Sequence, residues 1–311
     1  MFTYYYGTNQ PNQRIEVTTQ VLQIFRKENV IQIPGSDHLR ALVFSDPAVG
    51  VLKFFYVVKD NIVVYCADHM TTVYIDIYTN EIHDQTTVTE RILKIYPNPH
   101  NKLQQIHNQM RFDFGNIRDE YPEQVLATQF LNGDETILEL GANIGRNTLV
   151  MDHLTGKRNR VVTLECDETT AKQLEHNKNI NNATFLIENS ALSDTPVYQK
   201  IGDWATVKSY APIEGYRRVH TITFSDLEVK YNIKFDTLVA DCEGALYYIL
   251  QEMPDMLQNI NTIIIENDFN DIEHKKFVDA KFKEYGLKCV HFEEGGWGPC
   301  FPFFYEVWKR V

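Results

Sequence analysis

The sequence TILELGANIGRNTLV, residues 136–150, begins as an apolar strand, turns at two glycines and continues as the start of a helix. From this point to the C-terminus, short apolar strand patterns alternate with amphipathic helical patterns. Continuous apolar strands separated by helices are typical of a parallel sheet that is covered on both faces. The sequence therefore predicts an α/β domain whose ligand lies beyond the carboxyl ends of the strands.

The predicted elements of this domain follow one another in regular alternation. Helices are expected at residues 145–155, 168–180, 244–253 and 271–286. Strands are expected at residues 136–140, 160–165, 183–188, 235–240, 260–266, 287–293 and 303–311. A glycine-rich loop separates the last two strands, which could therefore form an antiparallel hairpin at the edge of the sheet.

The first hundred residues show a different pattern, of short β-branched and aromatic runs between turn residues. This pattern predicts a smaller, mostly antiparallel β domain, with strands expected at RIEVTTQVLQIF (14–25) and RALVF (40–44) among others. VVKDNIVVY (57–65) is typical of a tight hairpin, because Asp and Asn tolerate the positive φ of its turn.

The prolines of YPNPHNK (96–102) indicate a boundary between the two patterns. We therefore divide the chain into residues 1–100, 101–120 and 121–311. The first segment is a β-rich domain for acceptor binding or oligomerisation, the second a helical linker, and the third the α/β domain.

The composition excludes several classes of protein. The chain of 311 residues has a formal net charge of −12 and no block of basic residues, which argues against a nucleic-acid partner. Its five cysteines are scattered singly, which argues against a disulfide framework and against a zinc cluster. No signal peptide or membrane-spanning stretch is visible, so we expect a cytoplasmic protein without a membrane partner.

The glycine turn is the predicted cofactor site. Gly141 and Gly145 remove side chains where the backbone turns and a ligand must come close. Glu139 precedes them, and a carboxylate beside the turn favours a cationic group over a phosphate. The third glycine of the dinucleotide fingerprint is missing. This pattern therefore favours S-adenosylmethionine, with its sulfonium and ammonium groups, over NAD.

Two further strand ends support a nucleoside site. Glu165 ends the next strand, where a carboxylate can accept hydrogen bonds from both ribose hydroxyls. After the third strand, Ser190 and Ala191 are small enough to leave room for a flat ring. Asn189 or Glu188 could bond the edge of an adenine there. The position of Glu165 does not by itself distinguish S-adenosylmethionine from NAD.

The chain resembles the FkbM-type family of S-adenosylmethionine-dependent methyltransferases in four segments that occur in the family's order. They are DEYPEQVLATQFLNGDETILELGANIGRNTL (119–149), VVTLECDETTAKQLEHNKNIN (161–181), ENSALSD (188–194) and FDTLVADCEGALYYIL (235–250). The resemblance implies a Rossmann-like class I methyltransferase fold with a mostly parallel seven-stranded sheet and helices on both faces. It also implies methylation of hydroxyl groups of sugars or small natural products.

The resemblance carries over to individual positions. Those that it implies for cofactor binding are Gly141, Asn143, Gly145, Glu165 and Ala191, and those at the reaction edge are Asp241 and Glu243. The chain departs from the family's pattern near the reaction edge, at Val239, Cys242 and Leu246. The resemblance does not cover the first hundred residues.

The acidic strand end after residue 240 is the predicted catalytic site. Asp241 and Glu243 share one side of an extended chain, and either could act as the base that accepts a hydroxyl proton. Both could also hold a divalent cation, although no metal site is predicted. His220 is a further candidate for catalysis, and Trp204 and the GGWGP loop (295–299) could stack on a sugar.

These observations favour an O-methyltransferase that acts on a sugar, a glycan or a glycosylated small molecule. The predicted cofactor residues are Glu139, Gly141, Asn143, Gly145, Glu165, Asn189, Ser190, Ala191 and Asp241. One alternative is a binding protein that recognises a glycan or a partner and has lost turnover. Another is a nicotinamide-dependent oxidoreductase. The β-rich domain could mediate formation of a homo-oligomer through exposed edge strands.

Overall fold

The computed structural model describes residues 2–310. The chain divides into two compact units, and each is described here by itself. The N-terminal unit extends to Asn98 and includes Lys288–His291. The C-terminal unit comprises Pro99–Leu287 and Phe292–Arg310.

A seven-stranded sheet forms the centre of the C-terminal unit, in the order β11-β10-β9-β17-β18-β20-β19. Five neighbouring strands pair in parallel, and β20 pairs with β18 in the antiparallel direction. This sheet confirms the predicted Rossmann-like fold with a mostly parallel sheet. The strands are β9 (Ile137–Leu140), β10 (Val161–Leu164), β11 (Leu186–Glu188), β17 (Thr237–Ala240), β18 (Thr262–Glu266), β19 (Leu287–Glu293) and β20 (Tyr305–Arg310).

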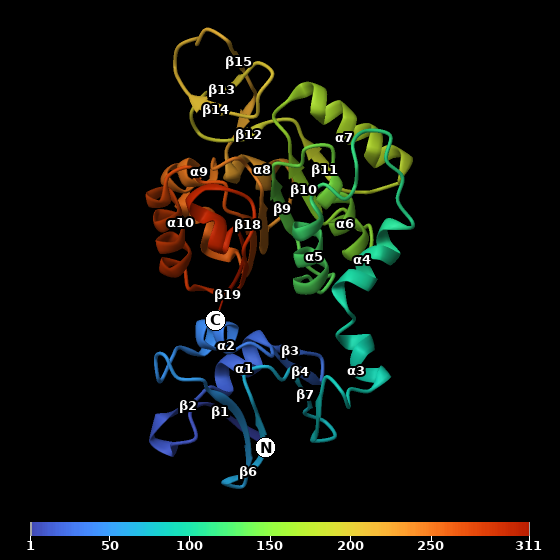
Figure 1. Ribbon diagram of the computed structural model, residues 1–311. Coiled ribbons are helices and arrows are strands. Elements are labelled where there is room, and N and C mark those ends of the chain that lie inside the picture. Colours follow the sequence, from blue (N-terminus) through green and yellow to red (C-terminus); the bar gives the residue numbers. More distant parts are fainter. Residues whose placement is uncertain (1, 311) are drawn as a thin grey trace. The chain divides into compact units, whose positions relative to one another are not determined.

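Helices cover both faces of this sheet (Figure 1). Helices α4, α5 and α6 contact one another on one side, where α5 packs on β18 and β20, and α9 and α10 contact each other on the other side. Among the described residues, no helix is both long and apolar enough to cross a bilayer. The helices of this unit are α4 (Pro99–His107), α5 (Tyr121–Phe130), α6 (Arg146–Leu154), α7 (Glu168–Ile180), α8 (Phe224–Tyr231), α9 (Leu246–Glu252) and α10 (Ile272–Glu284).

The last strand of the chain lies inside the sheet, between β18 and β19, so the edge position belongs to β19. Its position follows from its apolar side chains. Trp308 is buried, and its ring lies 5.2 Å from that of Phe282 on α10 in an edge-to-face arrangement. An edge strand would leave such a large ring partly in water, at a cost of about 2 kcal/mol.

A small antiparallel sheet is inserted between β11 and α8. Its central strand β13 (Val197–Lys200) pairs with β14 (Thr206–Lys208) and β15 (Tyr216–Arg218). The insertion leaves and rejoins the domain through two short parallel strands, β12 (Ala191–Leu192) and β16 (Thr221–Ile222). No strand was predicted for residues 195–219, because their apolar residues are few and the pairs are short.

The N-terminal unit contains two four-stranded antiparallel sheets, β2-β1-β5-β6 and β3-β4-β7-β8. The predicted hairpin is present between β5 and β6, and Asp60 and Asn61 have φ values of 51° and 64°. The strands are β1 (Phe2–Gly7), β2 (Arg14–Glu16), β3 (Arg26–Lys27), β4 (Val30–Ile33), β5 (Phe54–Lys59), β6 (Ile62–Ala67), β7 (Val73–Asp76) and β8 (Glu81–Asp84).

Two segments of this unit that were predicted as strands are mostly or wholly helical, although the first three residues of one of them, 14–16, do form strand β2. Most of residues 14–25 form α1 (Thr18–Ile24), and residues 40–44 belong to α2 (Asp37–Phe44). Helix α2 begins at an N-cap, where the Ser36 hydroxyl accepts a hydrogen bond from the N–H of Leu39. The apolar run that follows indicated a strand, so this cap was not recognised in the sequence. A third helix, α3 (Glu90–Ile95), also begins with a capping hydroxyl, that of Thr89.

Candidate cofactor and active site

One cavity lies at the carboxyl ends of the parallel strands. Its volume is about 360 Å³, and residues that follow β9, β10, β11 and β17 line it. In an open α/β sheet this is the edge at which ligands bind. The predicted residues that line the cavity are Gly141, Asn143, Glu165, Ser190, Ala191, Trp204, Asp241 and Glu243. The structure therefore brings together side chains that are far apart in the sequence.

The two turn glycines are needed because other protein atoms lie where their side chains would be. Both have positive φ, of 89° at Gly141 and 92° at Gly145. A Cβ at Gly141 would lie 1.6 Å from the carbonyl oxygen of Asp241, so the loops after β9 and β17 touch only because this side chain is absent. A Cβ at Gly145 would lie 2.5 Å from Leu174 of α7. Gly141 lines the cavity, whereas Gly145 begins helix α6 and is not among the lining residues.

Glu139 lies in the core beneath the cavity and does not line it. One of its carboxylate oxygens accepts hydrogen bonds from the hydroxyls of Thr148 (2.6 Å) and Thr163 (2.5 Å). Burial raises the pKa of Glu139 to about 8. Its role in this geometry is to connect β9 with β10 and α6, and the negative lining of the cavity comes from other residues.

Glu165 occupies the position expected for a ribose-binding carboxylate. It is buried, and its oxygens accept hydrogen bonds from the N–H groups of Asn143 (3.0 Å) and Asp167 (2.7 Å). Burial raises its pKa to about 7, and the N–H bonds act in the opposite direction. A carboxylate has about four acceptor positions, so this one retains capacity for two ligand hydroxyls.

The turn after β11 contributes a small-residue wall. Ser190 and Ala191 line the cavity, and the Ser190 hydroxyl donates to Glu188 across 2.8 Å. Asn189 is not among the lining residues, because its amide donates to the carbonyl of Glu165 across 2.7 Å. Glu188 is bound by Lys230 and by the Tyr231 hydroxyl. The side chains of Asn189 and Glu188, which were considered for binding the edge of an adenine, therefore form hydrogen bonds that fix this turn.

Asp241 and Glu243 diverge from the extended arrangement that their spacing suggested. Glu243 has a φ of 53°, an uncommon value for a residue with a side chain, and it is exposed. Partial desolvation of its carboxyl raises its pKa, and the charge of Asp203 acts in the same direction. Asp241 instead lies against other acids, and burial followed by the charge of Asp268 raises its pKa well above the ordinary range.

The inserted sheet supplies part of the cavity wall that sequence reasoning largely missed. Gln199, Val207 and Lys208 line the cavity together with Trp204, and Tyr248 of α9 adds a second aromatic ring. The Lys208 ammonium donates to the Tyr248 carbonyl (3.1 Å) and pairs with Glu252 (2.5 Å). His220 is exposed and does not line the cavity, although its carbonyl accepts a hydrogen bond from Ala191.

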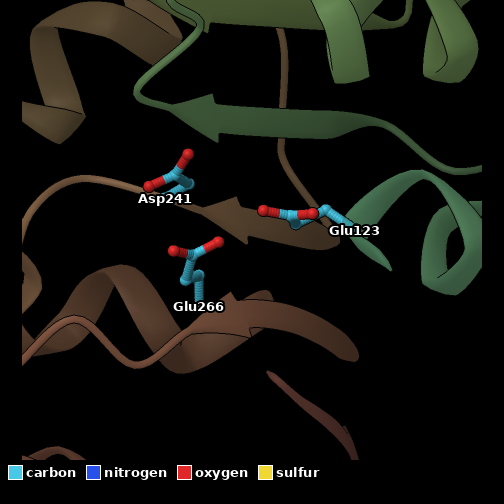
Figure 2. A group of neighbouring side chains, drawn as sticks. All are labelled: Glu123, Asp241 and Glu266. Atoms are coloured by element: carbon cyan, nitrogen blue, oxygen red, sulfur yellow. The ribbon is translucent and has the colours of Figure 1, made fainter. Parts of the chain in front are cut away.

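Three carboxylates meet beside the cavity. Figure 2 shows the side chains of Glu123, Asp241 and Glu266 gathered at one place, with Glu123 extending toward the other two. One oxygen of each lies within 4.8 Å of the others. Burial raises the pKa of Glu266 to about 12, and the neighbouring carboxyl of Glu123 and the charge of Asp241 add to the shift. Sequence reasoning missed Glu123 and Glu266 because α5 and β18 are far apart in the chain.

No family model and no curated protein matches the chain. The chain is similar to several solved structures at low identity. A ribosomal protein L11 methylase from Lactobacillus delbrueckii subsp. bulgaricus is 13% identical, with 64% of this chain and 81% of that chain covered and a TM-score of 0.41. A protein from Streptococcus pneumoniae in complex with S-adenosyl-L-methionine is 14% identical, with 61% and 72% covered and a TM-score of 0.37. With values this low, the fold assignment rests on the strand order.

Proposed function

We propose that the chain is an S-adenosylmethionine-dependent O-methyltransferase of the FkbM type. Its acceptor is a hydroxyl of a sugar, a glycan or a glycosylated small molecule. The observation that supports a nucleoside cofactor is the place of Glu165, at a strand end in the cavity, with both carboxylate oxygens held by backbone N–H groups. That arrangement fits the two hydroxyls of a ribose.

The charge of the cavity favours a cationic cofactor over a dinucleotide. The charged lining residues are Glu165, Asp241, Glu243 and one cation, Lys208. The ammonium of Lys208 already pairs with Glu252, so it offers little to a pyrophosphate. A sulfonium and an ammonium, in contrast, gain from the surrounding carboxylates. S-Adenosylmethionine, when bound, supplies the methyl group on its positively charged sulfur.

The residues on the reaction side suit a sugar hydroxyl. Trp204 and Tyr248 present half-exposed rings, on which the C–H faces of a sugar can stack. Glu243 is the proposed base, because it is exposed at the cavity and does not belong to the acidic cluster. A carboxylate with a raised pKa is a better proton acceptor for a hydroxyl. Asp241 borders the cofactor, whereas His220 lies outside this arrangement.

Two binding measurements and one assay test the proposal. Calorimetry should show 1:1 binding of S-adenosylmethionine and no binding of NAD. Transfer of a labelled methyl group to a panel of sugars and glycosides should then show turnover, and Glu243→Gln should reduce it strongly while cofactor affinity is retained. Binding of NAD instead would contradict the proposal. Cofactor binding without transfer to any saccharide would favour the glycan-binding alternative.

We further propose that the β-rich N-terminal segment binds the acceptor or mediates self-association. The strand β6 is at the edge of its sheet, and Ile62, Val63 and Val64 are exposed along it. An apolar edge strand with open backbone groups pairs readily with a second copy. Light scattering of the full chain would decide between the two roles, because only self-association predicts an oligomer.

A further inference from the structure

The three neighbouring carboxylates come from three separate elements of the C-terminal unit. Glu123 lies in the first turn of α5, Asp241 directly follows β17, and Glu266 is the last residue of β18. One oxygen of each side chain lies within 4.8 Å of the other two (Figure 2). Three like charges at such distances repel one another strongly in a protein interior. A cation bound between the three carboxylates, like protonation of them, would remove this repulsion.

One of the three carboxylates also has a buried oxygen without a hydrogen-bond partner. Glu123 is only 7% exposed, and its Oε2 atom has no hydrogen-bond partner. Figure 2 shows this carboxylate directed at Asp241 and Glu266. Asp268, two residues beyond Glu266, is a further buried acid, and its charge acts on Asp241. Buried acceptor atoms without donors are rare in folded proteins and call for an explanation.

We infer that Glu123, Asp241 and Glu266 bind one divalent cation of the Mg²⁺ or Mn²⁺ type. Hard cations of this kind are bound by carboxylate oxygens and retain several water molecules. Three carboxylates from three elements supply part of an octahedral set and leave room for water. The nearby charge of Asp268 adds to the attraction for a cation without direct contact. This inference does not depend on the proposed methyl transfer.

The position of the site gives the cation a place beside the cavity. Asp241 belongs both to the cluster and to the cavity lining, whereas Glu123 and Glu266 belong to the cluster alone. A bound cation would therefore connect α5, β17 and β18 at the edge where the ligand binds. It would also remove the mutual repulsion of the three carboxylates, so binding should stabilise the folded chain.

Mn²⁺ alone is the suitable probe, because electron paramagnetic resonance measures the free ion directly. We expect the purified chain to bind one Mn²⁺ at neutral pH without any cofactor or acceptor. Glu123→Gln and Glu266→Gln should each weaken binding by at least about 10-fold. Glu228→Gln is the matched control: Glu228 is a buried glutamate of α8 that pairs with Lys234. It should bind Mn²⁺ like the wild type.

Thermal unfolding with and without Mg²⁺ separates metal binding from a merely structural role. Without metal, Glu123→Gln should not lower Tm, because the amide removes an acidic group from the cluster and keeps an oxygen at the same place. With Mg²⁺, Tm of the wild type and of Glu228→Gln should rise, whereas that of Glu123→Gln should not change. Absence of Mn²⁺ binding at millimolar concentration, or equal binding by wild type and both cluster variants, would overturn the inference.

Discussion

The backbone N–H of Asn143 donates a hydrogen bond to the Glu165 carboxylate across 3.0 Å, which ties the loop after β9 to the loop after β10. The N–H of Asp167 donates to the other oxygen across 2.7 Å. The carboxylate is therefore oriented before any ligand arrives, and little conformational entropy is lost when hydroxyls bind to it. The same bonds limit how the side chain can be replaced.

We predict that Glu165→Gln weakens binding of S-adenosylmethionine by about 10- to 100-fold, since a hydrogen bond to a charged group contributes about 1.5–3 kcal/mol. The amide would also bring an NH₂ group against the N–H of Asn143 or Asp167, so the side chain loses its fixed orientation. Calorimetry measures the effect. Glu168→Gln, an exposed position in the first turn of α7, should retain the affinity of the wild type.

Gly141→Ala should be far more destabilising than the same change at Gly202. Both glycines have positive φ, of 89° and 78°, which costs alanine about 1–2 kcal/mol. Only at Gly141 would the new Cβ meet protein, 1.6 Å from the Asp241 carbonyl, whereas nothing lies within 4 Å at Gly202. We expect a loss of more than about 3 kcal/mol for Gly141→Ala. Urea unfolding measures the loss of stability in both variants. Equal losses would contradict the prediction, because they would mean that the loops after β9 and β17 can move apart to admit the new methyl group.

The stability of the chain should decrease as the pH rises from about 4.5 to about 8, partly because of Glu139. Burial raises the pKa of this carboxyl from 4.5 to about 8 in the folded state. The unfolded chain therefore ionises first, and the stabilisation that is complete below pH 4.5 is lost as the pH passes the folded value. The full loss is on the order of 5 kcal/mol.

Glu139→Gln tests this assignment, since its amide can still bond the hydroxyls of Thr148 and Thr163 but cannot ionise. Free energies of unfolding measured from pH 5 to pH 8.5 should show a smaller slope for this variant than for the wild type. Glu175→Gln, on the exposed face of α7, should leave the slope unchanged. A slope that does not change in Glu139→Gln would assign the pH dependence to other buried acids.

Trp204→Ala should raise KM for a saccharide acceptor by about 3- to 10-fold and leave the affinity for S-adenosylmethionine unchanged, because stacking on an aromatic ring contributes about 0.5–1.5 kcal/mol. Tyr210→Ala is the control. Tyr210 is an exposed aromatic residue of the same insertion that does not line the cavity. If both variants had the same KM as the wild type, the acceptor would bind elsewhere.

The parallel sheet was predictable because its strands are continuous apolar runs and its helices are amphipathic. Where the pattern was ambiguous, the prediction failed. Residues 40–44 are an apolar run that suits a buried strand or a buried helix, and the cap at Ser36 decided for the helix. The position of β20 inside the sheet follows from the burial of Trp308, which is a tertiary effect.

The site residues that directly follow the first parallel strands could be predicted from the sequence, whereas the other site residues could not. Residues such as Glu165 stand at a position that the fold itself directs toward the cavity. Glu123 and Glu266 had no such signal, because only the packing of α5 against β18 brings them together. Glu139 was predicted to bind the cofactor because of its position beside the glycine turn. Its carboxylate instead accepts hydrogen bonds from Thr148 and Thr163 in the core.

The inserted sheet leaves the domain at Ala191 and returns at Thr221, and these two residues are paired side by side in β12 and β16. The inserted segment therefore begins and ends at neighbouring positions of the domain. Changes in its length or composition can accumulate without shifting the central strands, while Trp204 and its neighbours at the cavity change with them. A change in the insertion would therefore alter one wall of the cavity and leave the strand ends, with Glu165 among them, in place.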